Sequence, residues 1–228
     1  MDGAAAAQIK APAGTIDDLL QTAERLFAHD GVENVALTQI VAQAGQKNRS
    51  ALHYHFGSRS GVLTAVLNRR LAAINARREA MMAALPASPA VAEVLRAEIA
   101  PLAQVVLEEP WGPDYLSILA QVTYHPQLLG EPGVADAYLT GLRRGRVMLA
   151  LAAPRTPASA LDQRVVWFKD SVVFALARWV RDTPTPQRTS TALSTLLEQL
   201  VAYGAAGLSA PAPHSIRSEA HDPSAVRR

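Results

Sequence analysis

Residues 38–63 read TQIVAQAGQKNRSALHYHFGSRSGVL, and this stretch decides the fold. Its apolar residues recur at spacings of three and four, which predicts one short helix over residues 38–44 and a second over about 48–56. Thr38 is a candidate N-cap for the first helix, and Gly45 ends it because glycine tolerates the positive φ of a helix C-terminus. Two short helices joined by a glycine turn match a helix-turn-helix, although helical bundles that do not bind DNA also contain such turns.

The outward side of the second short helix carries hydrogen-bonding groups that suit phosphates and base edges. The side chains in question are Lys47, Asn48, Arg49, Ser50, His53 and Tyr54. Lys47 and Arg49 can reach guanine acceptors, and Asn48 can pair with adenine. His53 or Tyr54 can meet a phosphate. The pattern favours DNA binding by this helix.

Charge is distributed unevenly along the chain. The whole sequence has 22 basic and 20 acidic residues, a sum that says little about partners. From Gln46 to Arg78, however, there are seven Lys or Arg residues and no Asp or Glu, so a polyanion would feel a local positive field. We expect a merely solvated helix face for the arginines further along, which are Arg69, Arg70, Arg77 and Arg78. Phosphate or base contact is favoured for Lys47, Arg49 and Arg59.

The residues from Thr38 to Gly45, then LHYHFGSR over 52–59 and Leu63, resemble the signature of the tetracycline-repressor (TetR/AcrR) family. The resemblance covers roughly residues 15–65. It implies a homodimeric bacterial transcription regulator, usually a repressor, with an N-terminal three-helix domain that binds an operator. It also implies a C-terminal helical domain that holds an effector and the dimer interface.

The same resemblance implies that Thr38 and Arg59 contact phosphates, with Arg59 standing where the family often has Lys. His53 stands where the family usually has Tyr, and Tyr54 occupies the variable position after it. One residue more separates Gly45 from Phe56 than in the commonest form of the signature. Which of residues 47–49 faces the bases is therefore left open.

Composition excludes several classes of protein. The chain has 228 residues, of which 49% are apolar, and it has no cysteine. A disulfide scaffold, a thiol nucleophile and a Cys-ligated metal are therefore excluded. No apolar run approaches the roughly 18 residues needed to cross a bilayer, and residues 1–10 do not have the pattern of a signal peptide. We expect a cytoplasmic protein with no membrane partner and no cofactor.

The recurring helical periodicity predicts an all-α fold in two domains. We expect a flexible arm over 1–14, a three-helix helix-turn-helix domain over 15–60, a linker helix with a C-terminal helical bundle over 61–208, and a disordered tail over 209–228. Thr15 is expected to cap the first helix, and Ser58 or Ser60 the long helix that runs to about residue 85. Further helices are expected near residues 90–109, 113–124, 134–152, 161–181 and 187–208.

The C-terminal half gathers most of the aromatic residues on helices that we expect to pack together. An ordinary core explains most of them, but a bundle interior with large rings and a few polar groups also describes a ligand pocket. The candidate ligand-binding residues are Trp111, Tyr115, Tyr124, His125, Trp167 and Ser171. An apolar or aromatic small-molecule effector is favoured.

The last two long helices are the predicted homodimer interface, because two-fold pairing doubles the contacts that a small recognition unit makes with DNA. Their apolar stripes are also needed for the domain core. The candidate interface residues are Val172, Leu176, Val180, Leu193, Leu196, Leu197 and Leu200.

Two other classes of function remain as alternatives. A helical enzyme would need an acid–base pair such as His125 with Glu108 or Glu109, and a helical protein-interaction module would use the small domain only as a protein-binding surface. Phosphate-binding glycine loops and the common hydrolase motifs are absent from the sequence.

His53 and His55 project about 200° apart on a helix, so they cannot share a metal ion without other ligands. The basic cluster over 143–146 is interpreted as a solvated helix face.

Overall fold

A computed structural model describes residues 13–46, 50–131 and 133–211 of the chain. Within these ranges the protein consists of nine α-helices and four single-turn 3-10 helices, with no strand. The all-α prediction is therefore confirmed. No helix in the described part of the chain combines the length and the apolar character needed to cross a membrane.

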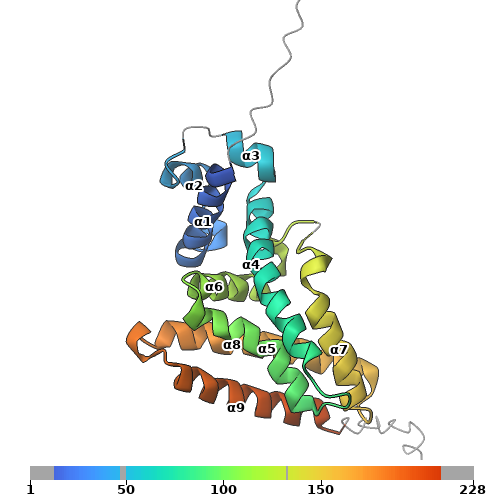
Figure 1. Cartoon of the computed structure of the whole chain (residues 1–228). Helices are drawn as coiled ribbons and strands as arrows, with labels where there is room; N and C mark the ends of the chain where they lie inside the picture. The colour runs from blue at the N-terminus through green and yellow to red at the C-terminus, as the bar shows by residue number, and fades with distance from the viewer. Residues whose placement is uncertain (1–12, 47–49, 132, 212–228) are drawn as a thin grey trace, which may run out of the picture.

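The N-terminal unit is built from three helices, α1 (Ala13–Asp30), α2 (Leu37–Gln43) and α3 (Ser50–Phe56), with the 3-10 helix η1 (Val32–Asn34) after α1. It lies at one end of the molecule (Figure 1). Its core consists of fully buried apolar side chains, among them Leu19, Phe27, Ile40 and Leu52. Gly45 has a φ of 67°, so the turn between α2 and α3 uses the left-handed conformation that the sequence predicts there.

The helix caps agree only in part with the sequence. Ser58 caps α4, where its hydroxyl accepts a hydrogen bond from Gly61 N at 3.1 Å. The predicted cap by Thr38 is wrong, because α2 begins one residue earlier and Ala36 occupies the N-cap position. The cap predicted at Thr15 is wrong for the same reason, since α1 already begins at Ala13. Residues 47–49, where the second short helix was expected to begin, lie outside the described residues.

Helix α4 (Arg59–Ala83) connects the two parts of the molecule. Its 25 residues span about 37 Å and run from the N-terminal unit into the C-terminal bundle (Figure 1). Apolar side chains are buried along its whole length, from Leu63 through Ile74 to Met82. A single continuous helix therefore belongs to both cores.

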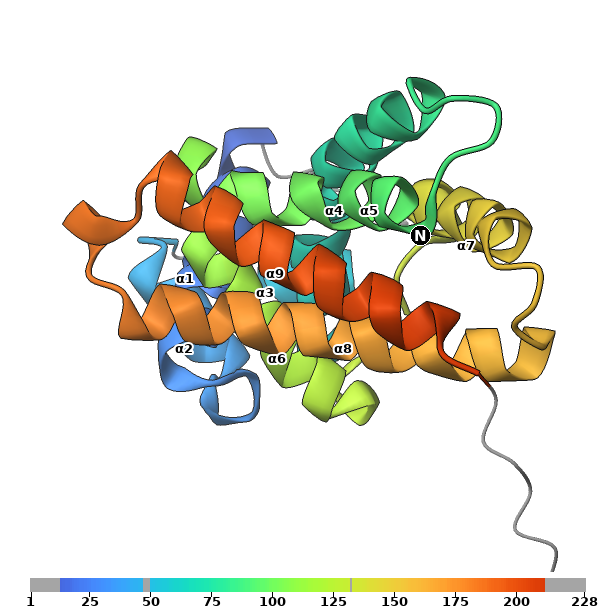
Figure 2. The same ribbon diagram turned by 90° about the horizontal axis from the view of Figure 1, so that it is seen from below.

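The C-terminal bundle is arranged around α5 (Val91–Glu108), which packs against α4, α7 and α9. Helix α6 (Gly112–Tyr124) lies between α1 and α8 (Ala158–Asp182). Helices α8 and α9 (Ser190–Ser209) lie side by side on the side of the molecule away from the N-terminal unit (Figures 1 and 2). Pro101 lies inside α5 without ending it.

Helix α7 (Thr140–Ala152) begins later than the predicted residue 134. Amide side chains of α4 bind the backbone at two points, one ahead of α7 and one in its first turn. Asn68 Oδ1 accepts a hydrogen bond from Ala135 N at 3.0 Å, and Asn75 Oδ1 accepts one from Gly141 N at 2.9 Å. Residues 136–138 form the 3-10 helix η3 instead.

Candidate functional site

Helix α3 presents an exposed surface at the end of the molecule farthest from α8 and α9 (Figure 1). Leu52 is buried on its inner side, while Tyr54 is 65% exposed. His53 is also exposed, and its Nδ1 lies 3.1 Å from Gly57 O. Thr38 is exposed near the start of α2, and Ser50 begins α3. The predicted residues Lys47, Asn48 and Arg49 lie outside the described residues.

Arg59, predicted to contact phosphate, lies in the first turn of α4 and is exposed. Its Nη1 donates a hydrogen bond to Glu33 O of η1 at 2.5 Å. A guanidinium has several N–H donors, so this bond leaves others for a phosphate. Arg59 therefore ties the start of α4 to the segment that follows α1.

Of the four arginines further along α4, Arg69 is exposed as the sequence predicts, whereas Arg70, Arg77 and Arg78 are not part of a solvated face. Arg70 Nη2 lies 2.5 Å from Glu24 Oε2, and its guanidinium stacks on the ring of Trp111 at 4.5 Å. Arg77 pairs with Glu108 and Glu109 at 2.7 Å. These acidic residues come from α1 and from the end of α5, which are distant in sequence. The absence of Asp and Glu between residues 46 and 78 therefore does not mean that these arginines lack acidic neighbours in the folded protein.

The basic cluster on α7 also pairs with acids from other segments. Arg144 Nη1 lies 3.5 Å from Glu79 Oε2, and Arg146 Nε lies 2.5 Å from Asp162 Oδ1. Arg143 pairs with Asp136. The charge of this cluster is thus largely compensated within the protein, although Arg143 and Arg144 remain partly exposed.

Helix α6 holds the C-terminal end of α1 by side-chain hydrogen bonds. The amide of Gln121 donates to Phe27 O at 2.9 Å and accepts from Val32 N at 2.8 Å. Ser117 Oγ donates to Ala28 O at 3.0 Å. Backbone groups that the end of a helix leaves unpaired are thereby satisfied by the C-terminal domain. The N-terminal unit consequently has two attachments to the bundle, α4 and α6.

A cavity of about 230 Å³ lies within the C-terminal bundle, between α4, α5, α6, α7 and α8. Its walls are almost entirely apolar. They include Leu67 and Leu71 of α4, Leu102 of α5, and Val122 of α6. We call this space the apolar cavity. It has the character of a small-molecule site, with apolar walls and few polar groups.

The polar groups of the apolar cavity are four side chains, Arg78, Glu98, Tyr115 and Lys169. Arg78 is 4% exposed, and its Nε donates to Glu98 O at 2.9 Å. Lys169 Nζ lies 2.9 Å from Glu98 Oε1. Burial raises the pKa of Tyr115, and desolvation lowers the pKa of Arg78. Among the candidate ligand-binding residues from the sequence, only Tyr115 lines this cavity.

Sequence reasoning missed the three charged groups of the apolar cavity, although a signal was present. Glu98 follows Val94 by four residues and precedes Leu102 by four, so it interrupts the apolar stripe of α5. Arg78 interrupts the stripe of α4 between Ile74 and Met82 in the same way. A charged residue at a core position of a helix is a candidate functional group, because burying it is costly.

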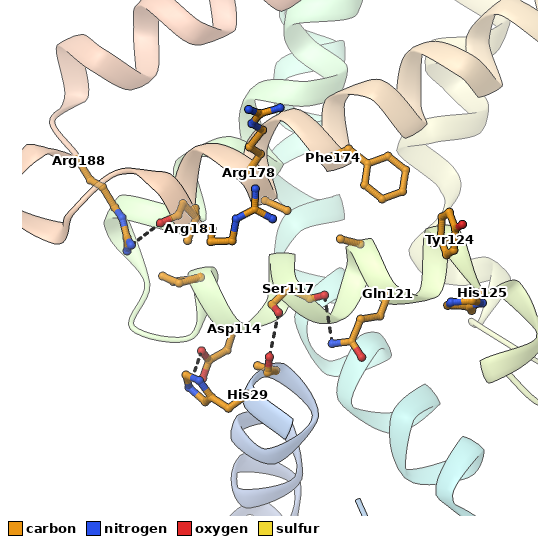
Figure 3. A pocket seen from close by; sticks show the side chains of 15 residues that line it. His29, Asp114, Ser117, Gln121, Tyr124, His125, Phe174, Arg178, Arg181 and Arg188 are labelled. Carbon is orange, nitrogen blue, oxygen red and sulfur yellow. Dashed lines mark hydrogen bonds and ion pairs between the residues drawn. The ribbon is translucent and has the colours of Figure 1, made fainter. Parts of the chain in front are cut away.

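A second, open cleft of about 940 Å³ lies between the end of α1, helix α6 and the C-terminal half of α8. Figure 3 shows its lining, with Tyr124 and His125 from the end of α6 and Phe174 from α8. His29 Nε2 lies 3.5 Å from Asp114 Oδ1 at its edge. The structure thus brings Tyr124 and His125 together, but in a different site from Tyr115.

The remaining predicted ligand residues line neither the apolar cavity nor the open cleft. The ring of Trp111 contacts Arg70 and Tyr115 at the start of α6. Trp167 is 61% exposed on α8, and Ser171 Oγ donates to its carbonyl at 2.7 Å. The ring of Trp167 lies on the surface and not in the core. The buried side of α8 is formed instead by Val165, Phe168, Val172 and Leu176.

The predicted dimer residues divide between the core and the surface. Val172, Leu176, Leu193 and Leu200 are buried within the protomer, so in this conformation they cannot contact a partner. Their stripes are used for packing on α5 and α6. Val180, Leu196 and Leu197 are partly exposed. The large apolar side chains that α8 and α9 do expose are Val166, Trp167, Phe174 and Tyr203.

The described part of the chain contains no group of three or more His, Asp or Glu residues placed to hold a metal ion. Four buried side-chain atoms have no partner with hydrogen-bond geometry among the described residues, and all belong to groups of the apolar cavity; one of them, Glu98 Oε1, is nevertheless in an ion pair with Lys169 Nζ. These atoms are Arg78 Nη1, Glu98 Oε1, Glu98 Oε2 and Tyr115 OH.

Two family models match the chain. Residues 19–66 match "Bacterial regulatory proteins, tetR family", and residues 96–207 match "Tetracyclin repressor-like, C-terminal domain". The chain belongs to the tetR family and is a DNA-binding transcription regulator. The family resemblance of residues 15–65 is therefore confirmed, and the C-terminal domain is included in it.

Solved structures share the fold at low sequence identity. The fatty acid degradation regulator FadR from Bacillus halodurans has a TM-score of 0.55 at 13% identity, covering 87% of this chain and 98% of that one. A putative tetR family regulator from Shewanella sp. PV-4 has a TM-score of 0.53 at 15% identity, with coverages of 83% and 97%. A putative transcriptional regulator from Saccharomonospora viridis, in complex with choline, has a TM-score of 0.53 at 20% identity, covering 84% of this chain and 96% of that one. No curated protein matches the sequence.

Proposed function

We propose that the protein is a ligand-responsive repressor that binds a palindromic operator as a homodimer in the bacterial cytoplasm. The observation that carries this proposal is the course of α4. Its first turn holds η1 through Arg59, while Leu67, Leu71 and Arg78 further along line the apolar cavity. A ligand in the cavity therefore touches the helix on which the DNA-binding unit is mounted.

The response to ligand requires two states of the dimer that bind the ligand with different affinity. In one state the α3 helices of the two protomers match successive major grooves, about 34 Å apart, and in the other they do not. The attachments of the N-terminal unit to α4 and α6 support this mechanism. A shift of either helix moves α1, which Gln121 and Ser117 hold from α6.

Operator contacts are assigned to the exposed side of α3 and its surroundings. The proposed residues are Thr38, Lys47, Asn48, Arg49, Ser50, His53, Tyr54 and Arg59. Lys47→Ala and Arg49→Ala are expected to weaken binding to the DNA upstream of the protein's own gene, measured by fluorescence anisotropy. Each lost phosphate contact lowers the salt slope by about one, whereas a lost base contact relaxes sequence preference.

Arg155→Ala is the matched control for those variants. Arg155 is an exposed arginine between α7 and α8, so its removal changes the net charge equally without touching the N-terminal unit. We expect its affinity for DNA to equal that of the wild type. Unchanged affinity and salt slope in both Lys47→Ala and Arg49→Ala would contradict the assignment of these residues.

The proposed dimer surface is the outer side of α8 and α9. Trp167 of α8 and Tyr203 of α9 are 61% and 63% exposed, and exposed apolar surface of this kind marks a site of protein association. The double variant Trp167→Glu/Tyr203→Glu is expected to sediment as a folded monomer in analytical ultracentrifugation. Tyr54→Glu, an equally exposed ring on α3, is the control and is expected to remain a dimer. A dimeric double variant would contradict this surface.

A further inference from the structure

The charged groups of the apolar cavity do not balance one another. Arg78 and Lys169 carry positive charges and Glu98 carries one negative charge, while the phenol of Tyr115 is neutral because burial raises its pKa. The nearby carboxylate of Glu79 is directed to Arg144 at 3.5 Å. The cavity therefore holds an excess of one positive charge within walls that are otherwise apolar.

Arg78 is the group whose charge lacks a full counterion. Lys169 Nζ lies 2.9 Å from Glu98 Oε1, so these two groups form a pair. Arg78 donates its hydrogen bond to the neutral backbone carbonyl of Glu98, while the carboxylates of Glu98 and Glu79 attract its charge without forming an ion pair with it among the described residues. Arg78 Nη1 and Tyr115 OH have no hydrogen-bond partner among the described residues, although both side chains are more than nine-tenths buried. Glu98 Oε2 is also without a partner there, but the carboxylate of Glu98 is already paired with Lys169 through Oε1. Such an arrangement is costly unless a ligand completes it.

The missing partner is defined by these groups. A carboxylate accepts hydrogen bonds from a guanidinium and from a phenol, and such charge-assisted bonds are short and strong. The remaining walls, which include Leu67, Leu71 and Leu102, suit an aliphatic chain. The volume of about 230 Å³ corresponds to about eight groups of the size of water, hence a chain of about six to eight carbons.

We propose that the apolar cavity binds an aliphatic monocarboxylate whose carboxylate group pairs with Arg78 and accepts a hydrogen bond from Tyr115. The chain of the ligand lies along the leucine-rich walls. This inference rests on the proposed function, because it takes the apolar cavity to be the effector site. The ligand class itself follows from the charges and unpaired atoms of the cavity.

The test is calorimetric titration of the full chain, without DNA, with octanoate, 1-octanol and octylammonium. These probes share one chain and differ in the charge of the head group. Octanoate is expected to bind at least about tenfold more tightly than the other two, as a charge-assisted hydrogen bond contributes this much. Equal binding of the three probes, or tighter binding of octylammonium, would overturn the proposal.

Two variants change the charge of the cavity in opposite directions. Lys169→Met removes the excess positive charge and is expected to weaken octanoate binding, whereas Glu98→Gln doubles the excess and is expected to strengthen it. The double variant Lys169→Met/Glu98→Gln keeps the original excess of one positive charge. It is expected to recover the octanoate affinity that Lys169→Met alone loses. A merely structural role predicts weaker binding in every variant, and that result would overturn the proposal. Circular dichroism establishes that each variant is folded.

DNA binding is measured separately, so the two proposals fail in different ways. Octanoate that binds the protein but leaves its affinity for DNA unchanged supports the ligand class and contradicts the ligand-responsive regulator. A chain that binds DNA but does not bind octanoate contradicts the ligand class alone. Release of DNA by octylammonium and not by octanoate also contradicts it.

Discussion

The hydroxyl group of Tyr115 gives the sharpest test of how the C-terminal bundle is built. The residue is fully buried, and its OH has no hydrogen-bond partner among the described residues. A buried polar group without a partner costs about 1–3 kcal/mol. Tyr115→Phe removes this cost and keeps the ring, including its edge-to-face contact with Trp111 at 5.9 Å.

We therefore expect Tyr115→Phe to raise the free energy of unfolding by about 1 kcal/mol or more, which for a chain of this size is about 2–4 °C in Tm per kcal/mol. The assay is urea denaturation followed by circular dichroism at one fixed protein concentration, because dimerisation adds to stability. Tyr54→Phe is the control. Its hydroxyl lies on a ring that is 65% exposed, so its removal is expected to change stability by less than about 0.5 kcal/mol.

Ligand provides the second half of this test. Tyr115→Phe cannot donate to a carboxylate, so saturating octanoate is expected to stabilise the variant less than the wild type. A variant that is less stable than the wild type without ligand would contradict an unpaired Tyr115 hydroxyl. It would mean that the hydroxyl has a hydrogen-bond partner in the folded protein without ligand.

Three further predictions concern packing and pH. Gln121→Met removes the amide that pairs backbone groups at the end of α1, and it is expected to lower the free energy of unfolding in urea by about 1–3 kcal/mol. Gly204→Ala places a methyl carbon 2.3 Å from the ring of Phe168, and thermal unfolding is expected to give a loss of about 1–3 kcal/mol. Burial disfavours the charged form of Asp114 and raises its pKa above 3.8. The free energy of unfolding is therefore higher at low pH, where Asp114 is protonated, and this gain is lost as pH rises through the folded pKa. In urea titrations from about pH 4 to neutral pH, Asp114→Asn is therefore expected to lose less stability than the wild type, and an equal loss would contradict this cause.

The helices follow closely from local sequence. Apolar spacing and the glycine turns predict α1, α2, α4 and the helices of the bundle, because each depends on residues a few positions apart. The start of α7 is different. It depends on Asn68 and Asn75 of α4, which are more than sixty positions away and bind the backbone of residues 135 and 141.

The site could be predicted only where its residues are neighbours in sequence. The exposed surface of α3 depends on one short segment, so Tyr54 and His53 could be placed from the pattern alone. The apolar cavity combines Arg78, Glu98 and Lys169 from three helices, and no local spacing links them. The predicted dimer residues include side chains buried within the protomer for a related reason, since an apolar stripe does not reveal whether α5 or a second protomer covers it.

The central claim is that a two-fold dimer reads an operator through α3 and its surroundings. Selection of bound sequences from a random DNA pool by the full chain tests it most directly. We expect the selected sequences to share a palindrome whose half-sites are separated by about one helical turn of DNA or a multiple of it. Selection of no common sequence, or of a single site without two-fold symmetry, would contradict the claim.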